Sequence, residues 1–406
     1  MPPDPPQVLF VDLSAADGGR WGPQPWRPAA ADLAGCAPWA GGGLATLLLL
    51  ESARAGEHGA FALAVGDGVR RGVPTAARAT VAARAPLTGR LAEGLVGGGL
   101  GRRLAGLADA LLLRGTVPGG AGVLVLERDG ARLERMPELA GLDPVATHAA
   151  LERRLGRCAS LRVGAAGERG LPVASLAGSD RVPSFVGRGG LGAAFAGLGL
   201  KALAVTASEL ATSPDPELVQ ALTASPRLQA RAAGGTFELG PARAARGELD
   251  RDAGQALARD AAETPRERVG CRGCPTPCGW AFTRPSSGGA GSPGQPARFG
   301  KLWSLGPPLG LASFDDALRL AAACDRVGVD AKEVGAALGL LARERGALGD
   351  LERLCAWVDA LGSERDEEAR LIGRGAAAVA AALGRPSPTR AGEARDPDRG
   401  AAAVLA

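Results

Sequence analysis

Five short apolar segments in the first half of the chain read as β-strands, and they constrain the possible folds more than any other feature. Several of them end at Gly or Asp-Gly, which are turn signals. Two longer patterns among them, residues 44–55 and 143–156, predict helices, the second starting at Asp-Pro. The expected strands cover residues 8–14, 79–85, 108–115, 121–130 and 201–207. The first half is therefore expected to be mixed α/β or β-rich.

From about residue 214 the pattern becomes helical. Segments 215–224 and 252–263 carry helical spacing, and residues 314–346 predict a helix, a tight turn at Gly328 and a second helix. We therefore predict an α+β protein, with a β-rich cofactor-binding domain before a helical domain that carries a cysteine cluster. The boundaries we expect are 1–206 for the first domain, 207–384 for the helical domain, and 385–406 for a disordered tail, with a flexible Ser/Gly/Pro loop at 284–298.

Charge and cysteine usage exclude several classes of protein. The net charge is only +4 over 406 residues, which does not favour a nucleic-acid or membrane-surface binder. The longest apolar run, residues 44–50, is too short to span a bilayer, and the amino terminus lacks a secretory signal pattern. Seven cysteines, an odd number, do not indicate a disulfide framework. We expect a cytoplasmic protein.

Three cysteines lie within eight residues, in the run CRGCPTPCGW. Cys271, Cys274 and Cys278 place soft thiolates at spacings that can enclose an iron–sulfur cluster or a zinc ion. A cluster fits better, because there is no second Cys-x-x-Cys and the two histidines, His58 and His148, are far away in sequence. Three incidental cysteines remain the alternative. The neighbouring Arg266, Arg268 and Arg272 would offset the negative charge of a cluster.

Glycine-rich segments recur along the chain, which contains 62 glycines. The segment GRGGLG, residues 187–192, matches the dinucleotide fingerprint, with Glu209 downstream as the acid that would contact a ribose. Pro183 stands where the preceding strand should be, so the match is weak. Several glycine loops flanked by arginines can also hold phosphates through backbone N–H groups. Together with the cysteines, they indicate a phosphate-bearing redox cofactor.

In their order, these segments resemble the aldehyde:ferredoxin oxidoreductase family. Its members hold a tungsten or molybdenum bis-pterin (molybdopterin-type) cofactor beside a [4Fe-4S] cluster. The resemblance implies oxidation of an aldehyde to a carboxylic acid, with electrons passed through the cluster to ferredoxin, and it implies a homodimer. It is carried by the segments VLFVDLS, GGGLATLLLLE, PTAARATVAARAPLTG, LVGGGLG, GRGGLGAAFAGLGLKALAV, VGCRGCPTPCGW, FGKLWSLGPPLG and CDRVGVDAKEVGAALGLLARE.

The same resemblance implies roles for individual residues. Cys271, Cys274 and Cys278 match the clustered ligands of the iron–sulfur site, and Asp325 and Asp330 match carboxylates that accept hydrogen bonds from pterin nitrogens. Asp330 also fits a helix capping pattern with Glu333, which is a purely structural reading. The other residues matched to the pterin site are Arg78, Gly97, Gly98, Arg188, Gly189, Gly190 and Gly192.

The chain also departs from the family pattern. A family arginine is Gly42 here, an Asn-Ser pair is Leu95-Val96, and an acidic residue is Gly300. The family continues beyond the point where this sequence stops, and the fourth cluster cysteine lies in that part. Neither Cys324 nor Cys355 occupies its place. We therefore expect a short form of the family that is inactive without a second polypeptide. The alternatives are a non-catalytic relic or accessory subunit, and more distantly a nucleotide-binding protein.

Overall fold

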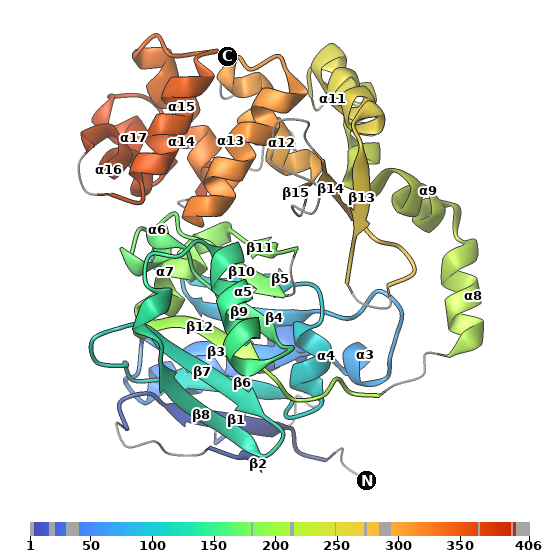
Figure 1. Cartoon of the computed structure of the whole chain (residues 1–406), viewed down its shortest axis with the longest axis vertical. Helices are drawn as coiled ribbons and strands as arrows, with labels where there is room; N and C mark the ends of the chain where they lie inside the picture. The colour runs from blue at the N-terminus through green and yellow to red at the C-terminus, as the bar shows by residue number, and fades with distance from the viewer. Residues whose placement is uncertain are drawn as a thin grey trace.

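The computed structural model describes residues 4–15, 21–29, 40–179, 182–211, 215–247, 249–271, 274–283, 294–363, 366–390 and 393–394. Its first half is a β-rich sandwich and its second half is mainly helical, so the predicted fold class is confirmed (Figure 1). In Figure 1 the helical part lies above the sandwich. Among the described residues, no helix has the length and apolar character needed to cross a membrane.

The sandwich is built from two six-stranded sheets. The first sheet contains, in spatial order, β2 (Pro23–Pro25), β1 (Gln7–Asp12), β6 (Ala110–Arg114), β3 (Phe61–Val65), β4 (Ala79–Arg84) and β5 (Leu91–Val96). The second contains β11 (Ser184–Val186), β10 (Leu176–Ser179), β9 (Ala159–Arg162), β12 (Leu200–Val205), β7 (Gly122–Glu127) and β8 (Gly130–Arg135). Most neighbours are antiparallel, but β1 with β6 and β7 with β12 are parallel.

Two helices cover the outer faces of the sheets, which gives four layers. The helices of this half are α2 (Gly41–Arg54), α3 (Asp67–Arg70), α4 (Leu100–Ala105), α5 (Pro144–Leu155), α6 (Ala165–Glu168) and α7 (Leu191–Ala196). Strand β3, FALAV, shows the layering: Phe61 and Leu63 pack between the sheets, whereas Ala62 packs under α2. Helix α5 covers the second sheet through Leu151. A strand apolar on both faces is expected when both faces are buried.

The second half begins with an arm of two helices, α8 (Pro216–Ala224) and α9 (Pro226–Gly234), in which no residue is fully buried. In Figure 1 these helices lie at the side of the molecule. Next come α10 (Leu239–Ala245), α11 (Arg251–Glu263) and a small antiparallel sheet of β13 (Arg266–Val269), β14 (Gly279–Phe282) and β15 (Gln295–Ala297). The helical core follows, with α12 (Phe299–Leu305), α13 (Phe314–Val327), α14 (Ala331–Glu344), α15 (Leu351–Ala360), α16 (Glu367–Gly373) and α17 (Ala376–Ala382).

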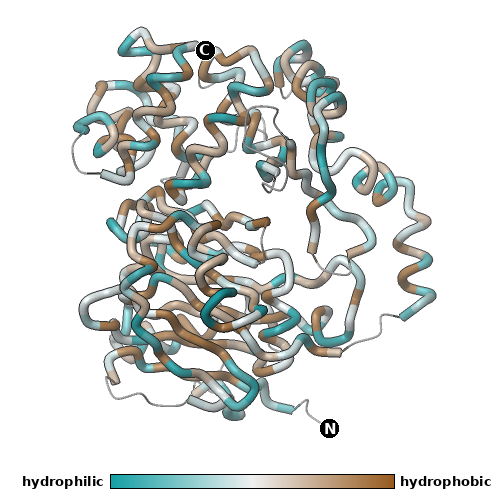
Figure 2. Tube along the Cα trace, in the orientation of Figure 1, coloured by the Kyte–Doolittle hydropathy of each residue, from teal (hydrophilic) through white to brown (hydrophobic). Residues whose placement is uncertain are grey.

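The helix–turn–helix expected at 314–346 is present as α13 and α14. Ser313 caps α13 through a hydrogen bond to Asp316 N, and Gly328 ends it in the left-handed conformation at φ 80°. The tube in Figure 2 shows apolar residues recurring along these helices. Buried side chains of both helices join one core with Phe237, Phe282 and Phe299.

Two expectations concern segments that are only partly described. Most of the predicted flexible loop, residues 284–293, lies outside the described residues, but its end forms strand β15. Most of the predicted disordered tail also lies outside them. The described part of the tail differs from the expectation, because Thr389–Arg390 (β16) and Glu393–Ala394 (β17) pair as antiparallel strands. Strand β17 contacts α14 and α17, which gives this short pair a surface to pack on.

Sandwich and helical part meet through their main chains beside α6 and α13. A Cβ atom at Gly164 would lie 2.4 Å from Val327 O, and one at Gly328 would lie 2.9 Å from Gly164 N. Hydrogen bonds from Ser175 N to Gly328 O (2.9 Å) and from Asp330 N to Val173 O (2.8 Å) join the same segments. Only glycine allows main chains to approach this closely.

Candidate functional site

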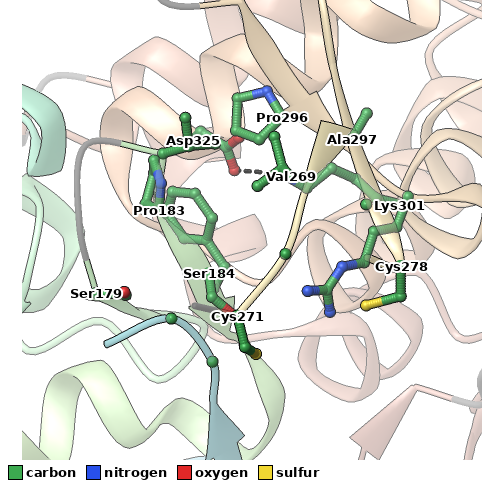
Figure 3. A pocket seen from close by; sticks show the side chains of 18 of the residues that line it. Ser179, Pro183, Ser184, Val269, Cys271, Cys278, Pro296, Ala297, Lys301 and Asp325 are labelled. Carbon is green, nitrogen blue, oxygen red and sulfur yellow. Dashed lines mark hydrogen bonds and ion pairs between the residues drawn. The ribbon is translucent and has the colours of Figure 1, made fainter. Parts of the chain in front are cut away.

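A cavity of about 1260 Å³ lies between the sandwich and the helical part. The sandwich contributes the loop after β5, the end of β10 and the segment around β11. The other wall comes from the β13–β15 sheet, α12 and the α13–α14 turn. Figure 3 shows side chains from both walls directed toward this space. Among the described lining residues, seven are arginine or lysine and four are carboxylates, so the lining favours an anionic ligand.

The glycine loop predicted at the cofactor connects β5 to α4 and lines the cavity at Gly97 and Gly98. Gly98 has φ +84°, and a Cβ atom there would lie 1.4 Å from Ser179 Oγ. Ser179 Oγ accepts a hydrogen bond of 3.0 Å from Gly99 N, so it fixes the loop. Glycine is required here both for the conformation and for the close approach.

A fully buried arginine supports Ser179 from behind. Arg162 Nη1 donates to Ser179 O at 2.7 Å and to Ser160 Oγ at 2.8 Å, and its Nε donates to Pro144 O at 2.5 Å. Ser160 Oγ also lies 2.9 Å from His148 Nδ1. Ser179 has φ +79°, an unfavourable value for a residue with a side chain. The hydrogen bond to its carbonyl holds it in that conformation.

The cysteine run lies between β13 and β14. Cys271 faces the glycine loop, because a Cβ atom on Gly97 would lie 3.1 Å from Cys271 Sγ. Burial raises the pKa of the Cys271 thiol and the neighbouring Cys274 and Cys278 raise it further, whereas a hydrogen bond from the Gly98 backbone lowers it. Both Cys271 and Cys278 line the cavity, while Cys274 Sγ lies 3.7 Å from Thr276 Oγ1.

These thiols supply the donors that a cluster needs, and Cys274 and Cys278 lie close enough to Cys271 to raise the pKa of its thiol. Within the described residues, no group of three or more His, Cys, Asp or Glu side chains is arranged to hold a metal ion. Two of the arginines predicted to offset the cluster charge pack on Trp280, with Arg266 at 4.6 Å and Arg268 at 5.4 Å from the ring centroid, and Arg268 also lines the cavity. Arg272 lies outside the described residues.

Asp330 caps a helix and also lines the cavity. Its Oδ1 accepts a hydrogen bond from Lys332 N at 3.0 Å and caps α14. Its buried Oδ2 has no hydrogen-bond partner in the described structure and lies 3.7 Å from Arg188 Nη1. Both residues line the cavity. The uncapped oxygen therefore offers an acceptor to a ligand, as the family resemblance implies.

We expect the two roles of Asp330 to separate on substitution. Asp330→Ala removes the cap and should lower the free energy of unfolding by about 1–2 kcal/mol. Asp330→Asn keeps a capping oxygen, so it should lose less than half of that. Urea denaturation of the three proteins measures the difference. An Asn variant as unstable as the Ala variant would show that the charge, not the cap, stabilises this turn.

Asp325 is placed at the cavity but already has two partners. Its Oδ1 accepts from Lys301 Nζ at 2.5 Å, and its Oδ2 accepts from Gln295 Nε2 at 2.7 Å. Burial raises the pKa of Asp325, and Lys301 opposes that shift. The structure thus gives Asp325 a structural role that its position at a helix end did not predict. It leaves less acceptor capacity for pterin nitrogens than Asp330 has.

The remaining predicted residues do not line the cavity in the described structure. Arg78 is exposed, although its charge lowers the pKa of Cys271. Gly189 and Gly190 have φ +76° and +75° and form the turn before α7. A Cβ atom on Gly192 would lie 2.4 Å from Ser175 O, so this glycine serves packing.

The structure shows the surroundings of the residues that depart from the family pattern. A Cβ atom at Gly42 would lie 2.9 Å from Glu93 Oε2, so β5 fills the space next to it. Leu95 is exposed and Val96 is buried. Gly300 lines the cavity without a side chain, next to Lys301. No acid therefore stands at position 300 to transfer a proton.

The context of a dinucleotide fold is missing around GRGGLG. The preceding strand, β11, is a short edge strand antiparallel to β10. The following helix, α7, has six residues, and Glu209 lies 3.8 Å from Arg102 in an ion pair. A dinucleotide site needs a parallel βαβ unit, so this topology does not support that reading.

The site has features that suit each expected cofactor. The glycine loop, Arg188 and Asp330 Oδ2, which lies 3.7 Å from Arg188 Nη1, suit a phosphate-bearing ligand with N–H donors. The cysteine run supplies soft thiols for a cluster, and Cys271 and Cys278 line the same cavity. Sequence reasoning missed Lys301, Ser179 and Arg162. Only Lys301 carried a signal, as one of three lysines in an arginine-rich chain.

Comparison with known proteins gives two family matches. A model described as "Aldehyde ferredoxin oxidoreductase, N-terminal domain" matches residues 36–207, and one described as "Aldehyde ferredoxin oxidoreductase, domains 2 & 3" matches residues 235–395. No curated protein matches. Among solved structures, the active site complex BamBC of benzoyl coenzyme A reductase, in complex with 1,5-dienoyl-CoA, is similar at 19% identity with a TM-score of 0.75. The match covers 96% of this chain and 65% of that one, so this chain spans less than two thirds of its neighbour.

Proposed function

Because the chain belongs to the aldehyde ferredoxin oxidoreductase family, we propose that it is an oxidoreductase that oxidises an aldehyde to a carboxylic acid and passes the electrons to ferredoxin. The observation that carries this proposal is the cavity. It brings Gly97, Gly98, Arg188, Asp330 and Cys271 together from segments far apart in sequence.

In this proposal the chain's residues bind and orient. The glycine loop and Arg188 hold the phosphates of a tungsten or molybdenum bis-pterin, and Asp330 Oδ2 accepts from its ring nitrogens. When bound, that centre supplies the oxidation chemistry, and a [4Fe-4S] cluster held by the cysteine run supplies the exit for electrons.

We further propose that a second polypeptide completes the site. The structural neighbour is described as a complex, and the cysteine run offers only three thiolates. The acid that the family carries near this site is Gly300 here, so a second polypeptide would supply that acid and the fourth ligand. A homodimer is the other assembly proposed, from the family resemblance.

Metal analysis of the anaerobically purified chain tests the function. We expect about four irons per chain, broad absorption in the visible range, and tungsten or molybdenum. Cys274→Ser should lose the iron, because it removes one of three clustered thiolates. Cys355→Ser is the matched control and should keep it, since Cys355 lies on α15 away from the run. Zinc without iron would contradict the cluster.

Dye reduction with an aldehyde, measured with and without candidate second polypeptides, then tests competence. We expect reduction only when a partner is present. A second candidate function, a non-catalytic accessory subunit, is favoured by one observation: Asp325, which the resemblance matches to a pterin contact, is already paired with Lys301 and Gln295. A folded chain that holds neither iron nor tungsten nor molybdenum, and that stays inactive with every partner, would support it.

A further inference from the structure

The lysines of this chain are unusually placed. Only Lys201, Lys301 and Lys332 occur among 47 basic residues. Lys201 is buried in the sandwich, where it pairs with Glu168 and donates to Leu142 O. Both of the others line the cavity. Lysine and arginine are not interchangeable, because lysine presents a compact ammonium with rotatable donors. In a chain that otherwise uses arginine, the cavity is where that group is concentrated.

Lys301 is held in place from two sides. Its Nζ donates to Asp325 Oδ1 at 2.5 Å and lies 4.8 Å from the ring centroid of Phe185, on the opposite wall of the cavity. Asp325 is itself fixed by Gln295 Nε2 at 2.7 Å. The side chains of Lys301 and Asp325 are 16% and 11% exposed, so both are largely shielded from water. An ammonium anchored in this way has one preferred direction.

The anchored ammonium still has donor capacity. An ammonium carries three N–H donors, and within the described residues its one hydrogen-bond acceptor is Asp325. The Lys301–Asp325 pair has no net charge, whichever partner holds the proton. Asp325 offsets much of the attraction that Lys301 would exert on a bound anion. The pair therefore favours an uncharged acceptor, such as a carbonyl oxygen.

Apolar side chains form part of the wall of the cavity that holds the pair. Phe185, Pro296, Ala297 and Val269 line the same cavity, and Figure 3 shows Pro296 and Val269 near Asp325. Such a wall suits the hydrocarbon or aromatic body of a small molecule whose polar group meets a fixed donor.

We propose that Lys301, anchored by Asp325, is a carbonyl-binding subsite of this cavity for an uncharged ligand with an apolar or aromatic body. Binding itself is a property of the chain alone. Only the identification of that ligand as the substrate aldehyde rests on the proposed function.

The test uses the full chain labelled with ¹³C-lysine, which gives signals from three lysines. Benzamide is the ligand, because it carries a carbonyl on an aromatic ring and does not react with amines. We expect benzamide to shift the Lys301 signal saturably and to leave that of Lys201 unchanged. Lys301→Gln should weaken binding by about tenfold, as expected for a lost hydrogen bond to a charged donor. Lys332→Gln, a matched change in the same cavity, should leave the affinity within about twofold.

Several results would contradict the proposed subsite. One is a Lys301 signal that does not shift with benzamide. Another is a Lys332→Gln variant that binds benzamide as weakly as Lys301→Gln does. Tighter binding of benzoate or inorganic phosphate than of benzamide would show an anion site instead. The titration of the unchanged protein needs no variant, and Lys301→Arg keeps the charge if Lys301→Gln does not fold. A chain that binds benzamide but holds no metal would support the subsite and contradict the proposed function. Aldehyde turnover without a benzamide-induced shift of the Lys301 signal would support the function and contradict the subsite.

Discussion

Gly98→Ala should lower the free energy of unfolding by about 2–4 kcal/mol, because two penalties add at this position. The first is the backbone, at φ +84°, and the second is the overlap of a new Cβ atom with Ser179 Oγ at 1.4 Å. The loop cannot move away without breaking the hydrogen bond from Gly99 N to Ser179 Oγ. Urea denaturation followed by tryptophan fluorescence measures the loss.

Two further variants separate the penalties at Gly98. Gly56 has φ +85° and nothing within 4 Å of its Cβ position, so Gly56→Ala reports the backbone effect alone, about 1 kcal/mol. Adding Ser179→Gly to Gly98→Ala removes the overlapping side chain and should recover more than half of the loss. Equal effects of Gly56→Ala and Gly98→Ala would show that Ser179 does not constrain the loop.

Arg162→Met should be the most damaging single change in the sandwich, with a loss of about 3–5 kcal/mol. Arg162 is fully buried, and its side chain donates to Pro144 O, Ser160 Oγ and Ser179 O. Methionine fills similar space but leaves these buried acceptors without this donor. The midpoint of thermal unfolding and the fluorescence of the folded state both report the change.

Replacing an exposed arginine by methionine gives the stability change with which Arg162→Met is compared. Arg84 is exposed and donates to Gly89 O at 3.1 Å, so Arg84→Met should change stability by no more than about 0.5 kcal/mol. Arg162→Lys should lie between the two, because one ammonium can satisfy only part of the set of acceptors. If Arg162→Met were as mild as Arg84→Met, the buried arginine would not hold Ser179 in its strained conformation.

Sequence reasoning found strands with a continuous apolar run, such as β6, β7 and β12, but it missed β3, which also has one. Strands β6, β7 and β12 are buried on both faces, so their pattern is visible without knowledge of the partner strands. Strand β5 was missed, because LAEGLV alternates weakly and leads into the glycine loop. Strands β9 and β10, four residues each, are too short to show a period.

Site residues were predictable to the extent that their chemistry is local. The cysteine run predicted soft-metal ligands, and the family resemblance singled out Asp325 and Asp330, which lie at the turn between α13 and α14. The pairing of Asp325 with Lys301 was not predictable, because it depends on how α12 packs against α13. The same holds for Ser179, whose role arises only where β10 meets a loop 80 residues earlier in the chain.

The main-chain contact between Gly164 and Gly328 fixes the distance between the two walls of the cavity. Because backbone atoms there set the separation of sandwich and helical part, side-chain changes inside the cavity alter its chemistry without altering its width. A methyl group at Gly164 or Gly328 would act differently. It would push the two walls apart at one edge, while every side chain that lines the cavity stayed the same. Substitutions at these two glycines should therefore change the width of the cavity without changing the residues that line it.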